Sequence, residues 1–186
     1  NIFYGHNFSD LLKEANQLSE GAHIFCYPVR DPNRFGVAEI DSSGNVLSIE
    51  EKPELPSSNL AITGLYFYEN DAIQQAKNLT PSSRGETEIS DLNRFYLNEN
   101  KLKCTNLGRG FAWLDTGTHE ALLSASRFVE TIEHRQGFKI ACLEEISLQN
   151  GWVTVDEVDA HISSRTKSEY YKYVKDIVDD RKNKKL

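Results

Sequence analysis

The sequence predicts an α/β fold with a mixed β-sheet, followed by a small C-terminal helical subdomain. Segments of strand length alternate with segments of helical periodicity over residues 1–136, which is typical of a sheet covered by helices. Two short alternating runs predict a β-hairpin, so the sheet should contain antiparallel as well as parallel strands. Residues 137–186 lose the strand signals and keep the helical ones. A chain of 186 residues fits one large domain with such an appendage.

The first elements follow from apolar spacing and turn chemistry. Apolar residues at helical spacing predict a helix over 8–19, with Ser9 as its N-cap. The run AHIFCYPV predicts a strand over 22–29, and the turn sequence DPNRFG follows it. VAEID and VLSIEEKP, on either side of SSGN, predict the hairpin. A long strand over 60–69 contains Gly64, and a glycine inside a strand often marks the close approach of a ligand or another backbone.

The later elements are helices separated by two short strands. Short helices are predicted over 70–79 and within SSRGETEISDLNRFYLNENK. The apolar face of the second comprises Ile89, Leu92, Phe95 and Tyr96. KLKCTNLG and FAWL predict strands, and Thr118 should cap a helix over 119–135. In the C-terminal part, a further apolar stripe predicts a helix that carries Tyr170, Tyr173, Val174 and Ile177.

Charge and composition exclude several classes of protein. A net charge of −7 argues against a general nucleic-acid binder, which would normally present a basic face. No stretch approaches the roughly 20 apolar residues of a membrane span. Cys26, Cys104 and Cys142 lie far apart and form no CxxC pair, so we expect free thiols in a reducing compartment, the cytoplasm. The chain begins at Asn1, contains no methionine and opens in the middle of a strand pattern, which suggests a piece of a longer protein.

Two segments place charged side chains where packing does not require them. EEKP ends a predicted strand with Glu51 and Lys52 side by side. They are either a solvated strand end or a carboxylate for sugar hydroxyls beside an ammonium for a phosphate. SSRGETEIS opens a helix and contains Arg84 and Glu86. It is either an ordinary capping segment or an anion site at a helix N-terminus.

Gly36 and Asp115 also leave two interpretations open. Gly36, in RFGV, is either part of a tight turn or a backbone amide that meets a ligand. Asp115 follows the strand FAWL and is either an Asx-turn residue or a ligand of Mg²⁺. Magnesium takes few protein carboxylates, but one is too few for a good site, so Asp115 would need a partner. The five histidines are scattered and form no metal or triad pattern.

The segments NIFYG, YPVRDPNRFGVAEID, SIEEKP, AITGLYFYEN, SSRGETEISDLNRFY and GRGFAWLDTGTHEALLSAS occur in this order. Together they resemble the glucose-1-phosphate thymidylyltransferase family, from residue 1 to about residue 145. The resemblance implies a Rossmann-like nucleotidyltransferase core, here incomplete, and helical C-terminal assembly in a homotetramer. It also implies a Mg²⁺-dependent reaction of glucose 1-phosphate with dTTP that gives dTDP-glucose and pyrophosphate. dTDP-rhamnose for surface polysaccharide is a common destination of this product.

The resemblance also implies roles for individual residues. Lys52 and Arg84 would contact the sugar phosphate or pyrophosphate as catalytic groups, and Asp115 would be one of two metal-binding aspartates. The residues implied in substrate binding are Phe35, Gly36, Glu51, Lys52, Thr63, Gly64, Tyr66, Arg84, Glu86 and Trp113. Many relatives carry tyrosine where this chain has Phe35, so a hydroxyl contact would be absent there.

The family's Gly-rich loop, its thymine-reading residues and its second metal aspartate do not occur in this sequence. Residues 1–136 would then be the sugar-phosphate half of the core, and residues 137–186 the assembly subdomain. On this interpretation the chain by itself is inactive or nearly so. The alternative is a non-catalytic module for sugar-phosphate binding or oligomerisation.

Overall fold

A computed structural model describes residues 1–82, 85–165 and 167–183. The chain divides into two compact units, Asn1–Gly117 and Thr118–Leu186. The second unit therefore begins with the helix α4, His119–Gln136, ahead of the predicted boundary at residue 136. The functional roles assigned to the two parts of the chain stay predictions.

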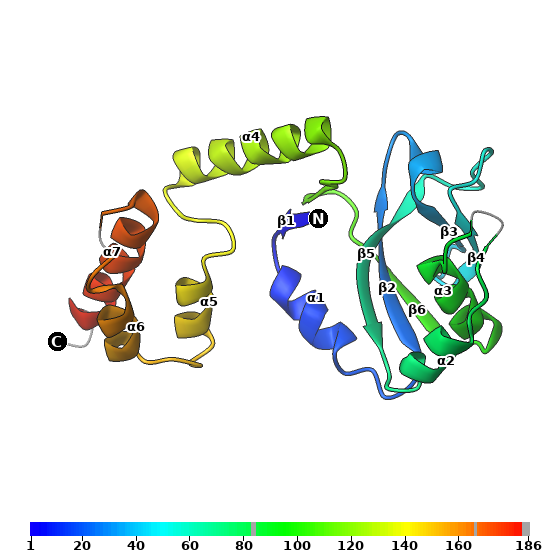
Figure 1. Ribbon diagram of the computed structural model, residues 1–186, viewed down its shortest axis with the longest axis horizontal. Helices are drawn as coiled ribbons and strands as arrows, with labels where there is room; N and C mark the ends of the chain where they lie inside the picture. The colour runs from blue at the N-terminus through cyan, green and yellow to red at the C-terminus, as the bar shows by residue number, and fades with distance from the viewer. Residues whose placement is uncertain (83–84, 166, 184–186) are drawn as a thin grey trace. The chain divides into compact units, whose positions relative to one another are not determined.

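The first unit is built on a five-stranded sheet with the strand order β4-β3-β5-β2-β6 (Figure 1). These strands are β2 Ala22–Pro28, β3 Gly36–Ile40, β4 Val46–Glu51, β5 Leu60–Tyr68 and β6 Leu102–Asn106. β2 runs parallel to β6 and antiparallel to β5, and β3 and β4 form the antiparallel hairpin. The prediction of a mixed sheet with an inserted hairpin is confirmed.

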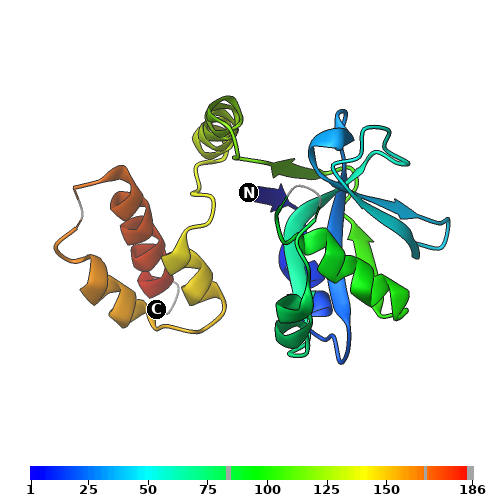
Figure 2. The same ribbon diagram turned by 45° about the vertical axis from the view of Figure 1, so that its right-hand side comes forward.

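Helices cover both faces of this sheet (Figures 1 and 2). α2, Ala72–Asn78, and α3, Ile89–Asn98, lie on one face. α1, Phe8–Ala15, lies on the other with a two-stranded ribbon of β1, Ile2–Gly5, and β7, Phe111–Leu114. Side chains alternate along β2, as a strand requires: Ala22, Ile24 and Cys26 join the clusters under α2 and α3, and Phe25 joins the cluster under α1.

Two local predictions are wrong. The N-cap of α1 is Asn7, in the left-handed region, and not Ser9. On α3, Ile89 is 41% exposed, although its spacing in the sequence predicts a place on the apolar face. The polar residues Ser90 and Asn93 are buried instead, because the face of α3 that meets the sheet also meets polar groups there.

A β-bulge interrupts β5 at Gly64. The pairing of β2 with β5 shifts its register between Ile24 and Cys26, and Thr63 and Gly64 lie opposite this shift. Gly64 has φ +77°, a conformation that favours glycine. The Thr63 hydroxyl donates to the Phe25 carbonyl at 2.9 Å, so the bulge does not leave that buried acceptor unpaired.

The second unit is helical, as predicted. Thr118 caps α4 by accepting a hydrogen bond from the Ala121 amide at 3.1 Å. The following helices are α5 Leu143–Gln149, α6 Val155–Ile162 and α7 Glu169–Asn183. They bury a cluster of Cys142, Leu148, Val158, Ile162, Val174 and Val178. Of the predicted stripe on α7, Val174 is fully buried, and the other three residues pack against this cluster.

Candidate functional site

The carboxylate of Glu51 is held in place at the end of β4. Ser90, on the first turn of α3 and 1% exposed, donates its hydroxyl hydrogen bond to Glu51 Oε2. Gly36 lies opposite Glu51 in the β3–β4 ladder. A Cβ at Gly36 would lie 3.0 Å from Ser90 Oγ and 3.3 Å from Glu51 Oε2, so glycine leaves room for this pair. The fixed carboxylate can accept hydrogen bonds from hydroxyl groups.

Lys52 follows with a strained backbone. Its φ is +43°, in the left-handed region that L residues rarely adopt, and its amide donates to the Phe35 carbonyl at 3.0 Å. Its Nζ atom lies 3.7 Å from Glu51 Oε1, and its side chain is 45% exposed. Strain of this kind concentrates at functional sites, and the accessible ammonium suits an anion.

Tyr66, on β5, faces the same region. Burial, with a smaller contribution from the negative charge of Glu51, raises the pKa of Tyr66 to about 12. Its phenol therefore stays protonated near neutral pH and can donate a hydrogen bond.

An aromatic pair forms a second side of the site. The rings of Phe35 and Trp113 lie edge to face, with centroids 5.1 Å apart. Trp113 Nε1 donates to Asn1 Oδ1 at 3.2 Å. A Cβ at Gly64 would lie 2.9 Å from Asn1 Nδ2, and the Asn1 amino group donates to Thr116 Oγ1 at 3.3 Å. Asn1 thus joins Gly64 and Trp113, two of the predicted site residues.

Asp115 follows β7 directly. Its carboxylate lies over Gly117, where a Cβ would come within 3.2 Å of Asp115 Oδ2. The pairing of Ile2 with Leu114 brings Asn1 opposite Asp115. In the described ranges, no group of three or more His, Cys, Asp or Glu side chains could hold a metal ion. Asp115 fits one ligand of a magnesium ion whose other positions are filled by water and phosphates, and it does not make a site by itself.

Comparison with known proteins identifies the family of this chain. Residues 1–132 match the model of the Nucleotidyl transferase family. The chain belongs to this family.

Several glucose-1-phosphate thymidylyltransferases are similar to this chain. The protein of Neisseria gonorrhoeae is 52% identical over 178 residues, which are 96% of this chain and 62% of that protein. The protein of Mycobacterium tuberculosis (strain H37Rv) is 44% identical over 179 residues, again 96% of this chain and 62% of that protein. The chain thus spans about three fifths of the length of these relatives.

A solved structure shares the fold. It is that of a putative glucose-1-phosphate thymidylyltransferase from Bacillus anthracis in complex with a sucrose. The match has a TM-score of 0.60 and 38% sequence identity, and covers 68% of this chain and 50% of that one.

Three further predicted residues are Thr63, Glu86 and Arg84. Thr63 is 1% exposed, and its hydroxyl donates within the bulge to the Phe25 carbonyl, so this side chain supports the backbone at Gly64. Glu86 is exposed, and its carbonyl accepts from the Ser82 amide at 2.8 Å. Arg84 lies outside the described residues.

Sequence reasoning missed Ser90 and Asn1 as parts of this site. Ser90 stands beside the predicted apolar face of α3, and nothing local marks it as the partner of a residue 39 positions away. In the sequence, Asn1 is only the first residue of the strand pattern NIFYG. Its place beside Trp113 and Asp115 follows from the pairing of β1 with β7, which the sequence does not show.

A cavity of about 320 Å³ lies in the second unit and contains none of the predicted site residues. Its lining comprises Leu143, Glu144, Ser147, Val153, Glu157, Val158 and His161. The walls are mainly apolar, and the two carboxylates would repel a phosphate. This cavity is therefore less suited to a sugar phosphate than the predicted residues at the end of the sheet, which include the accessible ammonium of Lys52.

Proposed function

We propose that this nucleotidyl transferase acts as a glucose-1-phosphate thymidylyltransferase in a protein that spans the full length of its relatives. A phosphate oxygen of glucose 1-phosphate attacks the α-phosphorus of dTTP. The bond from that phosphorus to the bridging oxygen breaks, and pyrophosphate leaves as dTDP-glucose forms. The observation that carries the proposal is the carboxylate of Glu51, fixed by Ser90 beside the accessible ammonium of Lys52.

Each group has a task in this reaction. Glu51 accepts hydrogen bonds from glucose hydroxyls, because Ser90 holds one of its oxygens. Gly36 leaves room for the Ser90–Glu51 pair, Gly64 leaves room for the Asn1 side chain, and Trp113 closes one side of the site. Lys52 neutralises a phosphate. Catalysis then consists mainly of positioning and charge neutralisation.

Asp115 is the proposed magnesium ligand of this chain. A bound Mg²⁺ would neutralise charge on the phosphates. The antiparallel pairing of β1 with β7 supports the proposal, because it brings the start of β1 beside Asp115. A second carboxylate just ahead of β1 would therefore lie near the first.

We also propose assembly into a cytoplasmic homotetramer through the helical unit, with dTDP-rhamnose or a related sugar nucleotide downstream. Leu143 is 70% exposed and Trp152 is 72% exposed in that unit, and large apolar side chains of this kind are common in subunit interfaces. The second candidate function is a non-catalytic module that binds a sugar phosphate or assembles. This second function is supported by the length of the chain, which spans only 62% of the relative from Neisseria gonorrhoeae.

Pyrophosphate release distinguishes the two functions. We would assay the 186-residue chain and the full-length protein with glucose 1-phosphate, Mg²⁺ and either dTTP or UTP. Release by the full-length protein with dTTP supports the enzyme; release with UTP alone overturns the choice of base, and no release with either leaves the module.

Calorimetry with glucose 1-phosphate tests the site itself. Lys52→Ala should weaken binding, whereas Lys13→Ala, an exposed lysine on α1, should not. Equal effects of the two substitutions would argue against a phosphate contact by Lys52.

A further inference from the structure

Two cysteines meet inside the sheet of the first unit. Cys26 lies on β2 and Cys104 on its parallel neighbour β6. The register pairs Ile24 with Cys104 and Cys26 with Asn106, so the two thiols are diagonal neighbours. Their sulfur atoms are 3.1 Å apart, and both thiols are free.

We propose that Cys26 and Cys104 form a reversible intrachain disulfide, an oxidative modification site built into the sheet. A disulfide requires sulfur atoms at about 2.05 Å, so an approach of about 1 Å between the two side chains is needed. The register on neighbouring strands fixes both backbones, and the two positions project from the same side of the sheet.

The exposure of the two thiols sets the order of the chemistry. Cys104 is half-buried and Cys26 is fully buried, so an oxidant reaches Cys104 first. Contact with Cys104 and burial raise the pKa of Cys26, which therefore remains a protonated thiol until its partner has reacted.

Hydrogen peroxide serves as the oxidant. The Cys104 thiolate attacks one peroxide oxygen, the O–O bond breaks, and a sulfenic acid and water form. The Cys26 sulfur then attacks the sulfenyl sulfur. The S–S bond forms, hydroxide leaves, and the proton from Cys26 converts it to water. In total, two thiols and one peroxide give one disulfide and two waters, and a dithiol such as dithiothreitol reverses the reaction by exchange.

The disulfide would link two neighbouring strands, β2 and β6, at one edge of the sheet. β6 is an edge strand of the five-stranded sheet, bonded in that sheet to β2. The disulfide would join two residues 78 positions apart and would tie this edge strand covalently to its neighbour β2. Cys26 also pairs with Ile62 directly before the bulge at Gly64, so the link lies next to a segment of the proposed site.

The test uses the 186-residue chain and does not require enzymatic activity. The reduced protein is treated with hydrogen peroxide, blocked with N-ethylmaleimide and digested for mass spectrometry without reduction. We expect a peptide pair joined through Cys26 and Cys104, the loss of two titratable thiols and their recovery with dithiothreitol. The oxidised protein should melt about 5–15 °C above the reduced protein.

The third cysteine provides the control. Cys142 is buried in the helical unit, so Cys142→Ser should leave the linked peptide unchanged, whereas Cys104→Ser should abolish it. Cys26→Ala provides a second variant with a small apolar side chain. Oxidation of Cys104 to sulfinic acid with Cys26 still reduced, or links only between separate chains, would overturn the proposal. Because the wild-type peptide map decides between these outcomes, the test does not depend on whether a variant folds.

Discussion

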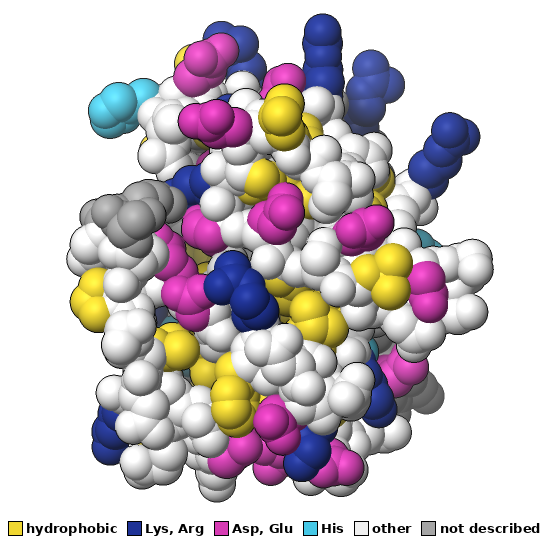
Figure 3. Space-filling view, turned by 90° about the vertical axis from the view of Figure 1, so that its right-hand side faces the viewer, with side chains coloured by type: hydrophobic (Ala, Val, Ile, Leu, Met, Phe, Trp, Pro, Cys, Tyr) yellow, Lys and Arg dark blue, Asp and Glu magenta, His cyan; other side chains and the backbone are white. Residues whose placement is uncertain are grey.

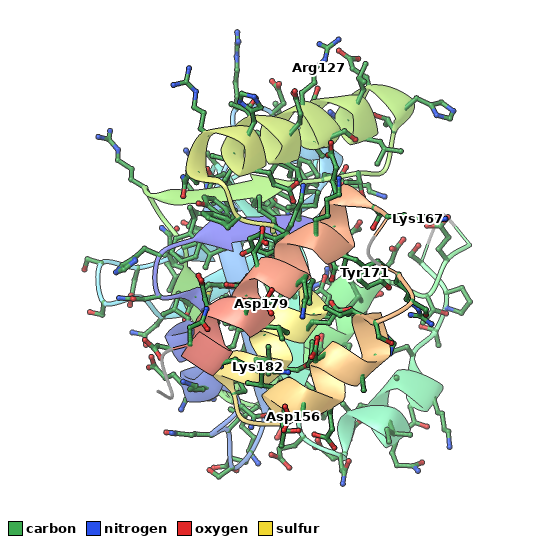
Figure 4. All side chains as sticks on the ribbon, turned by 90° about the vertical axis from the view of Figure 1, so that its left-hand side faces the viewer. Arg127, Asp156, Lys167, Tyr171, Asp179 and Lys182 are labelled. Atoms are coloured by element: carbon green, nitrogen blue, oxygen red, sulfur yellow. The ribbon has the colours of Figure 1, made fainter. Side chains whose placement is uncertain are left out.

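At the end of β4, charged groups stand next to strained backbone, whereas the helices α5–α7 pair their charges with one another. Lys52 has φ +43° and lies 3.7 Å from Glu51. In the helical unit, Asp159 accepts from Lys175 at 2.9 Å and from Lys182 at 2.6 Å. Lys182 also lies 3.6 Å from Asp156, across from it on α6 (Figure 4).

Two tyrosine hydroxyls of the helical unit also find hydrogen-bond acceptors within that unit. Tyr173 donates to Glu145 Oε2 at 2.7 Å, and Tyr170 donates to Glu144. Burial and then the bond to Glu145 raise the pKa of Tyr173 to about 12. These hydrogen bonds pair the polar groups within the helical unit. At the end of β4, by contrast, the Lys52 ammonium stays accessible. The strained backbone at Lys52 is a departure from local rules of the kind expected at functional sites, and it supports the site proposed at the sheet end.

The largest expected effect comes from removing a carboxylate at the sheet end, which should lower kcat far more than removing one in the helical unit. In the full-length protein, Asp115→Asn should lower kcat for pyrophosphate release by about 10³-fold, because the proposed charge stabilisation is lost. Asp159→Asn is the matched control, since the same atoms change in the helical unit, where the carboxylate binds two lysines. It should leave kcat unchanged. A similar loss in both variants would remove the distinction between the two regions.

A smaller effect is expected from removing the hydrogen bond by which Ser90 holds the Glu51 carboxylate. Ser90→Ala should raise KM for glucose 1-phosphate about tenfold, the effect of losing one hydrogen bond to a charged group. Ser48→Ala removes a similar bond on the same hairpin, from Ser48 Oγ to Glu39 Oε2 at 3.2 Å. Steady-state kinetics should show no change in KM for this control. If Ser48→Ala had the larger effect, Glu51 would not be the hydroxyl-binding group.

A substitution in the helical unit should change the free energy of unfolding and leave the kinetic constants unchanged. Thr154 and Glu157 form a capping box at the start of α6. Thr154→Ala should lower the free energy of unfolding by about 1 kcal/mol, measured by urea denaturation, with KM unchanged. Thr154→Ser keeps the hydroxyl and should restore most of the stability. A change in KM with Thr154→Ala would connect this unit to the site.

The smallest effect concerns His23, which is buried in the sheet unit and bonded to Thr105 at 2.8 Å. Burial, and then the charge of Lys103, lower the pKa of His23, while Glu14 opposes the shift. The folded protein thus binds this proton less well than the unfolded chain. Its stability contribution is fully present above the unfolded value of about 6.5 and declines as the pH falls through the folded pKa.

Urea unfolding at about pH 7.5 and about pH 5.5 measures this loss. His23→Gln should flatten the pH dependence. His134→Gln, at an exposed position of α4, should leave it as in the wild type. A steeper dependence in His23→Gln would contradict the assignment.

On the face over the hairpin and α3, basic, acidic and apolar side chains are interspersed (Figure 3). In the described part of the chain, no helix is long and apolar enough to cross a membrane.

The sequence by itself determined the elements and the family. Alternating runs and turn residues predicted the hairpin of β3 and β4, and Thr118 predicted the start of α4, because these features depend on neighbours within a few positions. The order of the motifs from NIFYG to AWLDTGT indicated the family that the match over residues 1–132 confirms.

Only the tertiary structure decided how the site is held. Ser90 meets Glu51 because α3 packs against β4, and Asn1 meets Gly64 and Trp113 because β1 pairs with β7. The Thr63 hydroxyl is used by a bulge that appears only when β2 and β5 pair. Local sequence carries no record of such contacts, since they join residues dozens of positions apart and depend on the register of strands and the rotation of a helix.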